Sequence, residues 1–131
     1  KVKEIASRVS TIHSLGTESA RDKLVDLEFP APQLLVQVNV SGEESKQGVA
    51  PQELDAFIAG AAYPVTGLMT MPPLTDEPEG ARPYFAKLRA MADERGLSAL
   101  SMGTSQDYVV AVEEGATLIR VGSVVFDHSN K

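Results

Sequence analysis

The chain has 131 residues, a mass of 14.0 kDa, and 43% hydrophobic and 23% charged residues, which is typical of one globular domain. Its formal net charge of −6 argues against nucleic acid as a partner, because phosphate backbones bind clustered Lys and Arg, and it gives no indication of an anionic membrane surface. The absence of cysteine excludes disulfides and thiolate sites, and no apolar run approaches the roughly 20 residues of a membrane span. We expect a single domain over residues 1–131, located in the cytoplasm.

The N-terminal half of the chain alternates short apolar runs with helical patterns, which is typical of βαβ units in a parallel sheet. Residues 41–48 form a polar loop within this alternation. The near-continuous apolar run at 33–40 is expected of a strand that is covered on both faces. In chain order, the pattern predicts the end of a helix at 1–8, a strand at 9–15, a helix at 18–27, a strand at 33–40 and a helix at 51–62.

The C-terminal half repeats the same pattern. Pro72 and Pro73 end its first strand, and Gly96 ends its long helix. The predicted elements are a strand at 65–71, a helix at 81–95, a strand at 99–103, a helix at 106–114 and a strand at 117–126.

Five strands of this kind could form an open doubly wound sheet or part of a (β/α)8 barrel. The glycine-rich fingerprint of dinucleotide-binding domains is absent, which weakens the first alternative. A complete barrel typically needs roughly 250 residues, which is far more than this chain contains. An incomplete barrel of about five βα units therefore has to be considered.

Two turns carry the clearest functional signal in the sequence. Each belongs to a stretch in which a buried strand runs into a turn of small residues, at Leu100–Asp107 and at Arg120–Ser123. Ser105 can cap the helix that follows, so that backbone N–H groups and a hydroxyl converge as in metal-free phosphate sites. On successive βα units the two turns would form one phosphate cup, a recurring feature after the last strands of (β/α)8 barrels. The simpler alternatives are that Ser105 is only an N-cap and that Gly122 only relieves crowding in the sheet.

Several ordered segments resemble the motifs of a known family. They are Val38–Val40, Glu44–Gly48, Gly67–Pro72, Leu100–Asp107 and Ile119–Ser123. In this order they are similar to motifs of the pyridoxal-phosphate homeostasis proteins, often labelled alanine racemase N-terminal-like. The resemblance runs from Lys1 to about Phe126. It implies a (β/α)8 barrel of which this chain holds strands four to eight, with pyridoxal 5′-phosphate (PLP) as the cofactor and a role in carrying it.

The resemblance also implies roles for individual residues. Arg120 would face the pyridine nitrogen of PLP, and because a protonated Arg can only donate, that nitrogen would stay unprotonated. An unprotonated ring is a poor electron sink, which favours a cofactor carrier over a transaminase-like catalyst. The alternative for Arg120 is a salt bridge at the barrel mouth. The implied phosphate site comprises Gly103, Thr104, Ser105, Gly122 and Ser123, and the implied ring pocket comprises Asn39, Met69 and Ser101.

The lysine that binds the cofactor covalently in the family has no counterpart in this sequence. That lysine ends the first strand of the barrel, whereas the resemblance puts Lys1 just past the third. Lys46 matches a loop lysine of the family instead. We expect the covalent lysine upstream of Lys1 in a longer polypeptide, and the alternative is that the chain has lost this half of its site.

Two other classes of function stay open. One is an enzyme similar to alanine racemase, which would need two acid/base groups on opposite faces of the substrate carbon, and no second base is apparent. The other is a scaffold whose turns bind only sulfate or phosphate. His13 is predicted to be a structural histidine on a strand, His128 lies in a polar tail, and neither has the spacing of a metal ligand.

An incomplete barrel has two open sheet edges, which a closed barrel lacks. We therefore expect a polypeptide of only these residues to be poorly stable or to pair edge to edge, and we expect the protein to be a monomer or a homodimer.

Overall fold

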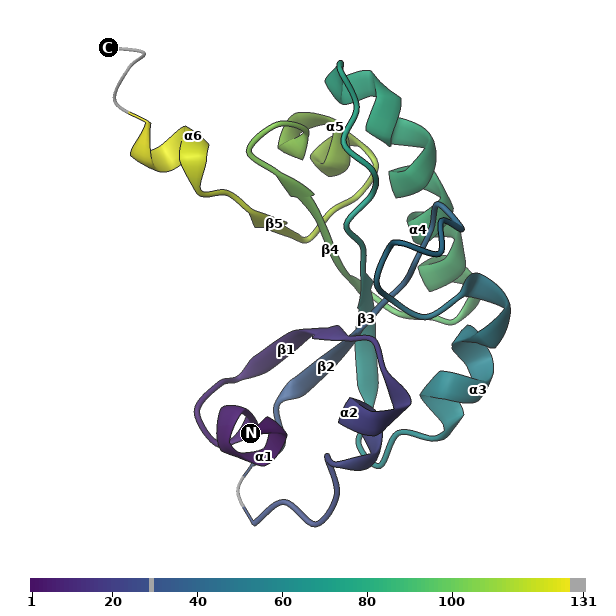
Figure 1. The fold of residues 1–131 in the computed structure, drawn as a ribbon, viewed down its shortest axis with the longest axis vertical. Coiled ribbons are helices and arrows are strands. Elements are labelled where there is room, and N and C mark those ends of the chain that lie inside the picture. Colours follow the sequence, from purple (N-terminus) through teal and green to yellow (C-terminus); the bar gives the residue numbers. More distant parts are fainter. Residues whose placement is uncertain (29, 128–131) are drawn as a thin grey trace.

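A computed structural model describes residues 1–28 and 30–127 (Figure 1). Within these residues the chain forms one sheet of five parallel strands, and each strand pairs with the next one along the chain. The sheet is curved and open on its inner side, which confirms the prediction of an incomplete (β/α)8-type barrel. The strands are β1 Thr11–Leu15, β2 Gln33–Gln37, β3 Val65–Met69, β4 Ala99–Thr104 and β5 Leu118–Arg120.

Helices precede and connect the strands and follow the last one. Two 3-10 turns, η1 Pro51–Glu53 and η2 Pro78–Ala81, lead into the two helices that flank β3 in the chain. Each turn begins at a proline, whose fixed φ suits the first turn of a helix. The α-helices are α1 Val2–Ala6, α2 Glu18–Asp22, α3 Leu54–Ala59, α4 Arg82–Glu94, α5 Tyr108–Glu113 and α6 Ser123–Phe126.

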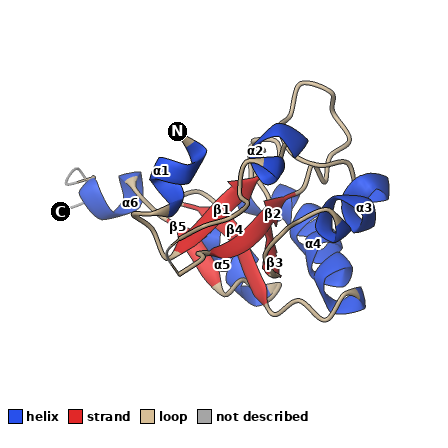
Figure 2. Ribbon diagram, turned by 90° about the horizontal axis from the view of Figure 1, so that it is seen from below, coloured by secondary structure: helices blue, strands red, loops and turns tan. Residues whose placement is uncertain are grey.

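The hydrophobic core lies between the outer face of the sheet and the helices. Side chains alternate between the two faces of a strand, and on β2 it is Leu34 and Val36 that join the core with Phe85 and Leu88 of α4. These four side chains are at most 2% exposed. The helix α4 packs against β3 and β4, and α5 packs against β4 and β5. Figure 2 shows the strands in the middle of the molecule, with α3 and α4 together on one side.

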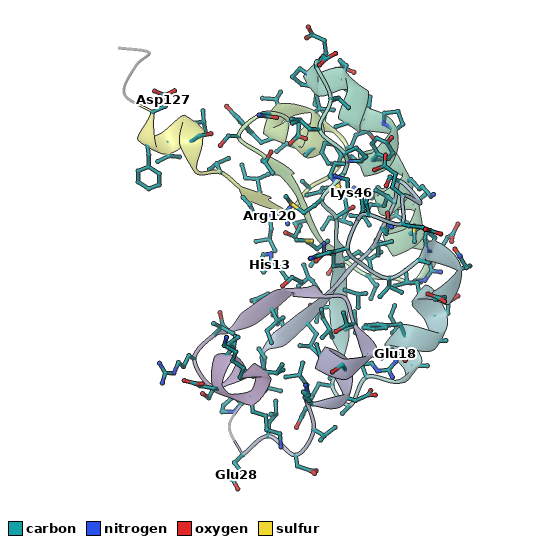
Figure 3. All side chains as sticks on the ribbon, in the orientation of Figure 1. His13, Glu18, Glu28, Lys46, Arg120 and Asp127 are labelled. Atoms are coloured by element: carbon teal, nitrogen blue, oxygen red, sulfur yellow. The ribbon has the colours of Figure 1, made fainter. Side chains whose placement is uncertain are left out.

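The inner side of the curved sheet carries polar side chains. Ser101 of β4 is fully buried, and His13 of β1 and Arg120 of β5 lie on the open side in Figure 3. His13 Nδ1 and Ser101 Oγ form a hydrogen bond of 2.8 Å, which joins two strands that are not neighbours in the sheet. His13 therefore has the structural hydrogen bond predicted for it. His128 lies outside the described residues.

The strand predicted at 117–126 is wrong beyond Arg120. The strand β5 has three residues, and the helix α6 begins at Ser123. The neighbouring strand β4 ends at Thr104, the residue that pairs with Arg120. No residue of β4 is therefore left to pair with the residues after Arg120. The next backbone amides donate to a side chain instead, and the chain leaves the sheet.

The helix predicted at 18–27 is shorter than expected. Thr17 caps its start, because the Thr17 hydroxyl oxygen accepts the Ala20 N–H at 3.2 Å, and the helix ends at Asp22. Leu24 is still 2% exposed, but it is buried from the segment after the helix. That segment includes Asp26 with a φ of 49°, which a helix does not allow. The apolar positions were thus right, and the helix is confirmed over Glu18–Asp22 but wrong beyond it.

The two edges of the sheet are β1 and β5. Large apolar side chains are exposed along and after β5, from Leu118 at 38% to Phe126 at 76%. Among the described residues, no helix is both long and apolar enough to cross a membrane.

The packing of α4 can be tested by truncation. Leu88→Ala should lower the free energy of unfolding by about 2–5 kcal/mol, because this side chain is fully buried against the sheet. Ala90→Ser, on the exposed side of the same helix, should change it by no more than about 0.5 kcal/mol. Urea unfolding followed by circular dichroism measures both, and equal losses would contradict this placement of α4.

Candidate functional site

The candidate site lies where β4 and β5 end side by side. Thr104 pairs with Arg120, so the two small-residue turns begin at the same edge of the sheet. The first turn depends on Gly103, whose φ of 98° is a conformation that L side chains rarely adopt. A Cβ at this position would lie 2.6 Å from the Cβ of Ala111 in α5. Glycine therefore allows β4 to turn sharply beneath α5.

The hydroxyl of Ser105 joins the two turns. Its Oγ accepts the backbone N–H groups of Gly122 and Val124 at 3.1 and 3.2 Å. The prediction that Ser105 caps the next helix is wrong, because Asp107 is the residue before α5 and no side chain caps this helix. A hydroxyl that accepts two hydrogen bonds still has its own proton to donate. The two turns therefore form one hydrogen-bonded unit with a donor to spare.

Close packing does not require glycine at position 122. A Cβ there would meet no atom of the described chain within 4 Å. The alternative that Gly122 relieves crowding in the sheet is therefore wrong. Ser123 follows at the start of α6 and is exposed. Open space thus lies beside the second turn.

The Asp107 carboxylate accepts hydrogen bonds from the first turn. Its Oδ1 accepts the backbone N–H of Thr104 at 2.7 Å and lies 3.3 Å from the Thr104 hydroxyl, which also donates to it. Our sequence reasoning missed this residue. The available signal was an acidic residue three positions after Thr104, a spacing at which a carboxylate can reach back to a backbone amide. A negative charge therefore lies at the turn where phosphate donors were predicted.

Arg120 has hydrogen-bond donors without acceptors. Its Nη2 donates to the backbone carbonyl of Thr70 at 2.9 Å, whereas its Nε and Nη1 are buried and have no partner among the described residues. Burial lowers the pKa of Arg120 from its usual value, and the charge of Asp107 opposes this shift. A guanidinium still stays protonated in proteins. The alternative of a salt bridge at the barrel mouth is wrong for the described residues, because Arg120 contacts a carbonyl and its Nε and Nη1 are left for another acceptor.

The three residues predicted to line a ring pocket lie on neighbouring strands or just after them. Met69 pairs in register with Ser101, and both are buried. Asn39 follows β2 and is half-buried. Its Nδ2 donates to the Glu43 carbonyl at 2.8 Å, and its Oδ1 accepts the Gly42 N–H at 3.2 Å. Asn39 therefore shapes the polar loop, and a ring contact stays a prediction for all three.

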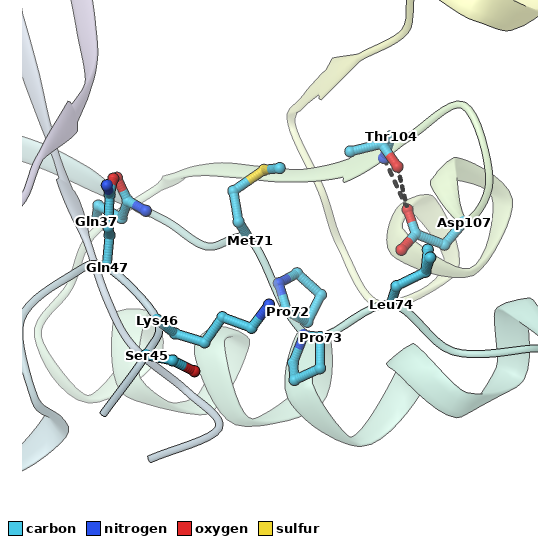
Figure 4. Close-up of a pocket in the computed structure, with 10 residues that line it drawn as sticks. All are labelled: Gln37, Ser45, Lys46, Gln47, Met71, Pro72, Pro73, Leu74, Thr104 and Asp107. Carbon is cyan, nitrogen blue, oxygen red and sulfur yellow. Dashed lines mark hydrogen bonds between the residues drawn. The ribbon is translucent and has the colours of Figure 1, made fainter. Parts of the chain in front are cut away.

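A cavity of about 420 Å³ opens beside the first turn (Figure 4). Lys46 enters it from the polar loop, Thr104 and Asp107 enter it from the turn, and prolines form much of the remaining wall. Within the described part of the chain, no cluster of His, Cys, Asp or Glu could hold a metal ion. The full lining is Gln37, Ser45, Lys46, Gln47, Met71, Pro72, Pro73, Leu74, Thr104 and Asp107.

The sequence is similar to curated proteins of one name, although no protein-family model matches it. The pyridoxal phosphate homeostasis protein of Aquifex aeolicus is 42% identical over 139 residues, which cover 96% of this chain and 61% of the relative. The protein of the same name from Deinococcus radiodurans is 43% identical over 124 residues, which cover 90% and 58%. The chain therefore spans about three fifths of the length of these relatives.

Solved structures with the same arrangement include PipY of Synechococcus elongatus PCC7942. Its structure without PLP has a TM-score of 0.81 and 31% identity over 96% of this chain and 65% of PipY. Its structure with PLP bound has a TM-score of 0.79 and 29% identity over the same shares of both chains. Alanine racemase from Corynebacterium glutamicum matches with a TM-score of 0.66 at 18% identity, over 93% and 37%, which shows a shared fold.

The two glycines of the site should respond differently to a methyl group. Gly103→Ala should lower the free energy of unfolding by about 1–3 kcal/mol, because the residue has a positive φ and its Cβ would meet Ala111. Gly122→Ala should change it by less than about 0.5 kcal/mol, since its Cβ points into open space. Thermal and urea unfolding measure both variants. A loss at Gly122 as large as that at Gly103 would contradict the open space at the second turn.

Proposed function

The chain belongs to the family of pyridoxal phosphate homeostasis proteins, and on this premise we propose that it binds PLP and holds it for transfer to other proteins. The observation that carries the proposal is that two buried donor atoms of Arg120 have no partner in the described chain, next to two turns that Ser105 joins. Because the chain spans about three fifths of its relatives, we assign to it the contacts to the phosphate and to the ring nitrogen.

Arg120 fits the pyridine nitrogen of PLP. A ring nitrogen is a hydrogen-bond acceptor, and the Nε and Nη1 of Arg120 lack one in the described residues. An unmet hydrogen bond of a buried donor costs about 1–3 kcal/mol, so an acceptor here would recover that free energy. Arg120 donates and cannot supply a proton to the ring, which then stays unprotonated. This favours storage of the cofactor over the stabilisation of carbanions.

The joined turns fit a phosphate group. Ser105 has a hydroxyl proton to donate, and Gly122 has open space where a side chain would otherwise stand. In the proposal, Thr104, Ser105, Gly122 and Ser123 hold the phosphate, and Gly103 sets the turn. When bound, PLP would supply an aldehyde that reacts with amines, and the phosphate contacts would fix its orientation.

The proposal includes further parts of the protein and its setting. Met69, Ser101 and Asn39 line the ring pocket or shape its rim. The protein works in the cytoplasm as a monomer or a homodimer, and light scattering after size-exclusion chromatography tests the second point.

A pair of substitutions separates the two halves of the cofactor contact. Arg120→Met should weaken PLP binding by about 10- to 100-fold, because it removes charge-assisted donors, and should leave the affinity for inorganic phosphate within about threefold. Gly122→Ala should weaken the binding of both ligands, because its methyl group would fill the open space at the turn. Fluorescence titration measures PLP binding, and ³¹P NMR measures phosphate binding.

Arg89→Met is the matched control, because Arg89 lies on α4, is 46% exposed at its side chain and pairs with Asp93 away from both turns. It should change neither affinity. Equal losses of PLP and phosphate binding in Arg120→Met would assign Arg120 to the phosphate, and an unchanged PLP affinity would remove it from the site. Racemisation of alanine by the protein with PLP would contradict the role of carrier.

A further inference from the structure

The backbone donors of both turns already have acceptors within the chain, but the two acceptors differ in charge. The second turn donates to Ser105, a neutral hydroxyl that can donate in turn. The first turn donates to Asp107, a carboxylate that accepts only. Figure 4 shows the Asp107 carboxylate facing Thr104 at the edge of the cavity. The second turn thus has a donor left for an anion, whereas the first turn is already bonded to the carboxylate of Asp107.

The charge of Asp107 is not neutralised by an ion pair. Among the described residues its side chain accepts hydrogen bonds from Thr104 only, and the Arg120 guanidinium, whose pKa is lowered by burial against the opposing charge of Asp107, donates to Thr70 instead. Lys46 lines the same cavity without a bond to the carboxylate in the described chain. A second anion at Thr104 would therefore meet a full negative charge.

We propose that Asp107 is a built-in competitor of the cofactor phosphate, a role that rests on the proposed function. Its carboxylate occupies the Thr104 N–H and hydroxyl, so a phosphate must displace or share these donors. A phosphate monoester carries about −1.5 to −2 charges at neutral pH, and like charges in contact repel strongly outside bulk water. Asp107 therefore limits how tightly the phosphate is held, which is what a protein that hands the cofactor on requires.

The test is the neutral isostere Asp107→Asn. Its side-chain oxygen can still accept the Thr104 N–H, so the turn keeps its hydrogen bond while the charge is removed. The matched control is Asp76→Asn, because Asp76 and Asp107 line one cavity of about 360 Å³ and Asp76 is exposed. The probes are PLP, inorganic phosphate and pyridoxal, which lacks the phosphate. Thermal unfolding of each variant checks that the fold is kept.

Asp107→Asn should tighten the binding of PLP and of inorganic phosphate by about tenfold or more at low salt, and the gain should shrink as salt is raised. Pyridoxal affinity should stay the same, and Asp76→Asn should have less than about a third of the effect. Weaker or unchanged phosphate binding in Asp107→Asn would overturn the inference, as would an equal gain from Asp76→Asn.

Failure of the proposed function has a different signature in the same titrations. If the unaltered protein binds neither PLP nor phosphate, the proposed function falls, and this inference falls with it. If the unaltered protein binds PLP and Asp107→Asn does not bind it more tightly, only the role of Asp107 is wrong. If Asp107→Asn unfolds at a much lower temperature and binds less, Asp107 is a structural residue of the turn.

Discussion

The pairing of Thr104 with Arg120 at the ends of β4 and β5 is the contact on which the site depends. Parallel strands end at one edge, and this register brings the two turns together there. It sets Ser105 over the amides of Gly122 and Val124, which ends β5 and starts α6. It also places Arg120 beside the carbonyl of Thr70. One strand register therefore determines both how the two turns meet and where the guanidinium lies.

Some hydrogen-bond donors of the site have acceptors within the described chain and others do not. The turn donors are satisfied by Ser105 and Asp107, whereas two donors of Arg120 have no acceptor in the described residues. Buried guanidinium nitrogens without an acceptor are destabilising, so the presence of Nε and Nη1 here is more readily explained by a ligand than by the fold. In the proposed site, the donors for the ring nitrogen thus have no acceptor in the described chain, whereas a donor for the phosphate is already bonded to the Asp107 carboxylate.

Much of the fold was predictable, because alternating strands and amphipathic helices carry their pattern in the sequence. Element ends were less so. The run after Arg120 is apolar enough for a strand, yet the end of β4 and the acceptor on Ser105 turn it into a helix. The local sequence was enough to predict that Ser105 lies in the turn after β4. It could not predict that Ser105 accepts the Gly122 N–H, because the two residues are 17 positions apart. Asp107 was missed because a single acidic residue before a helix has many ordinary roles.

In the proposed function, Arg120 binds the ring nitrogen of PLP while the joined turns bind its phosphate. The most direct test is a ¹H–¹⁵N NMR titration that follows the Nε–H of Arg120 and the amides of Thr104 and Gly122. With PLP, all three signals should shift together and saturate at one concentration. With inorganic phosphate, the two amides should shift and the Arg120 signal should stay. Amides that move with PLP while the Arg120 Nε–H does not would contradict the account.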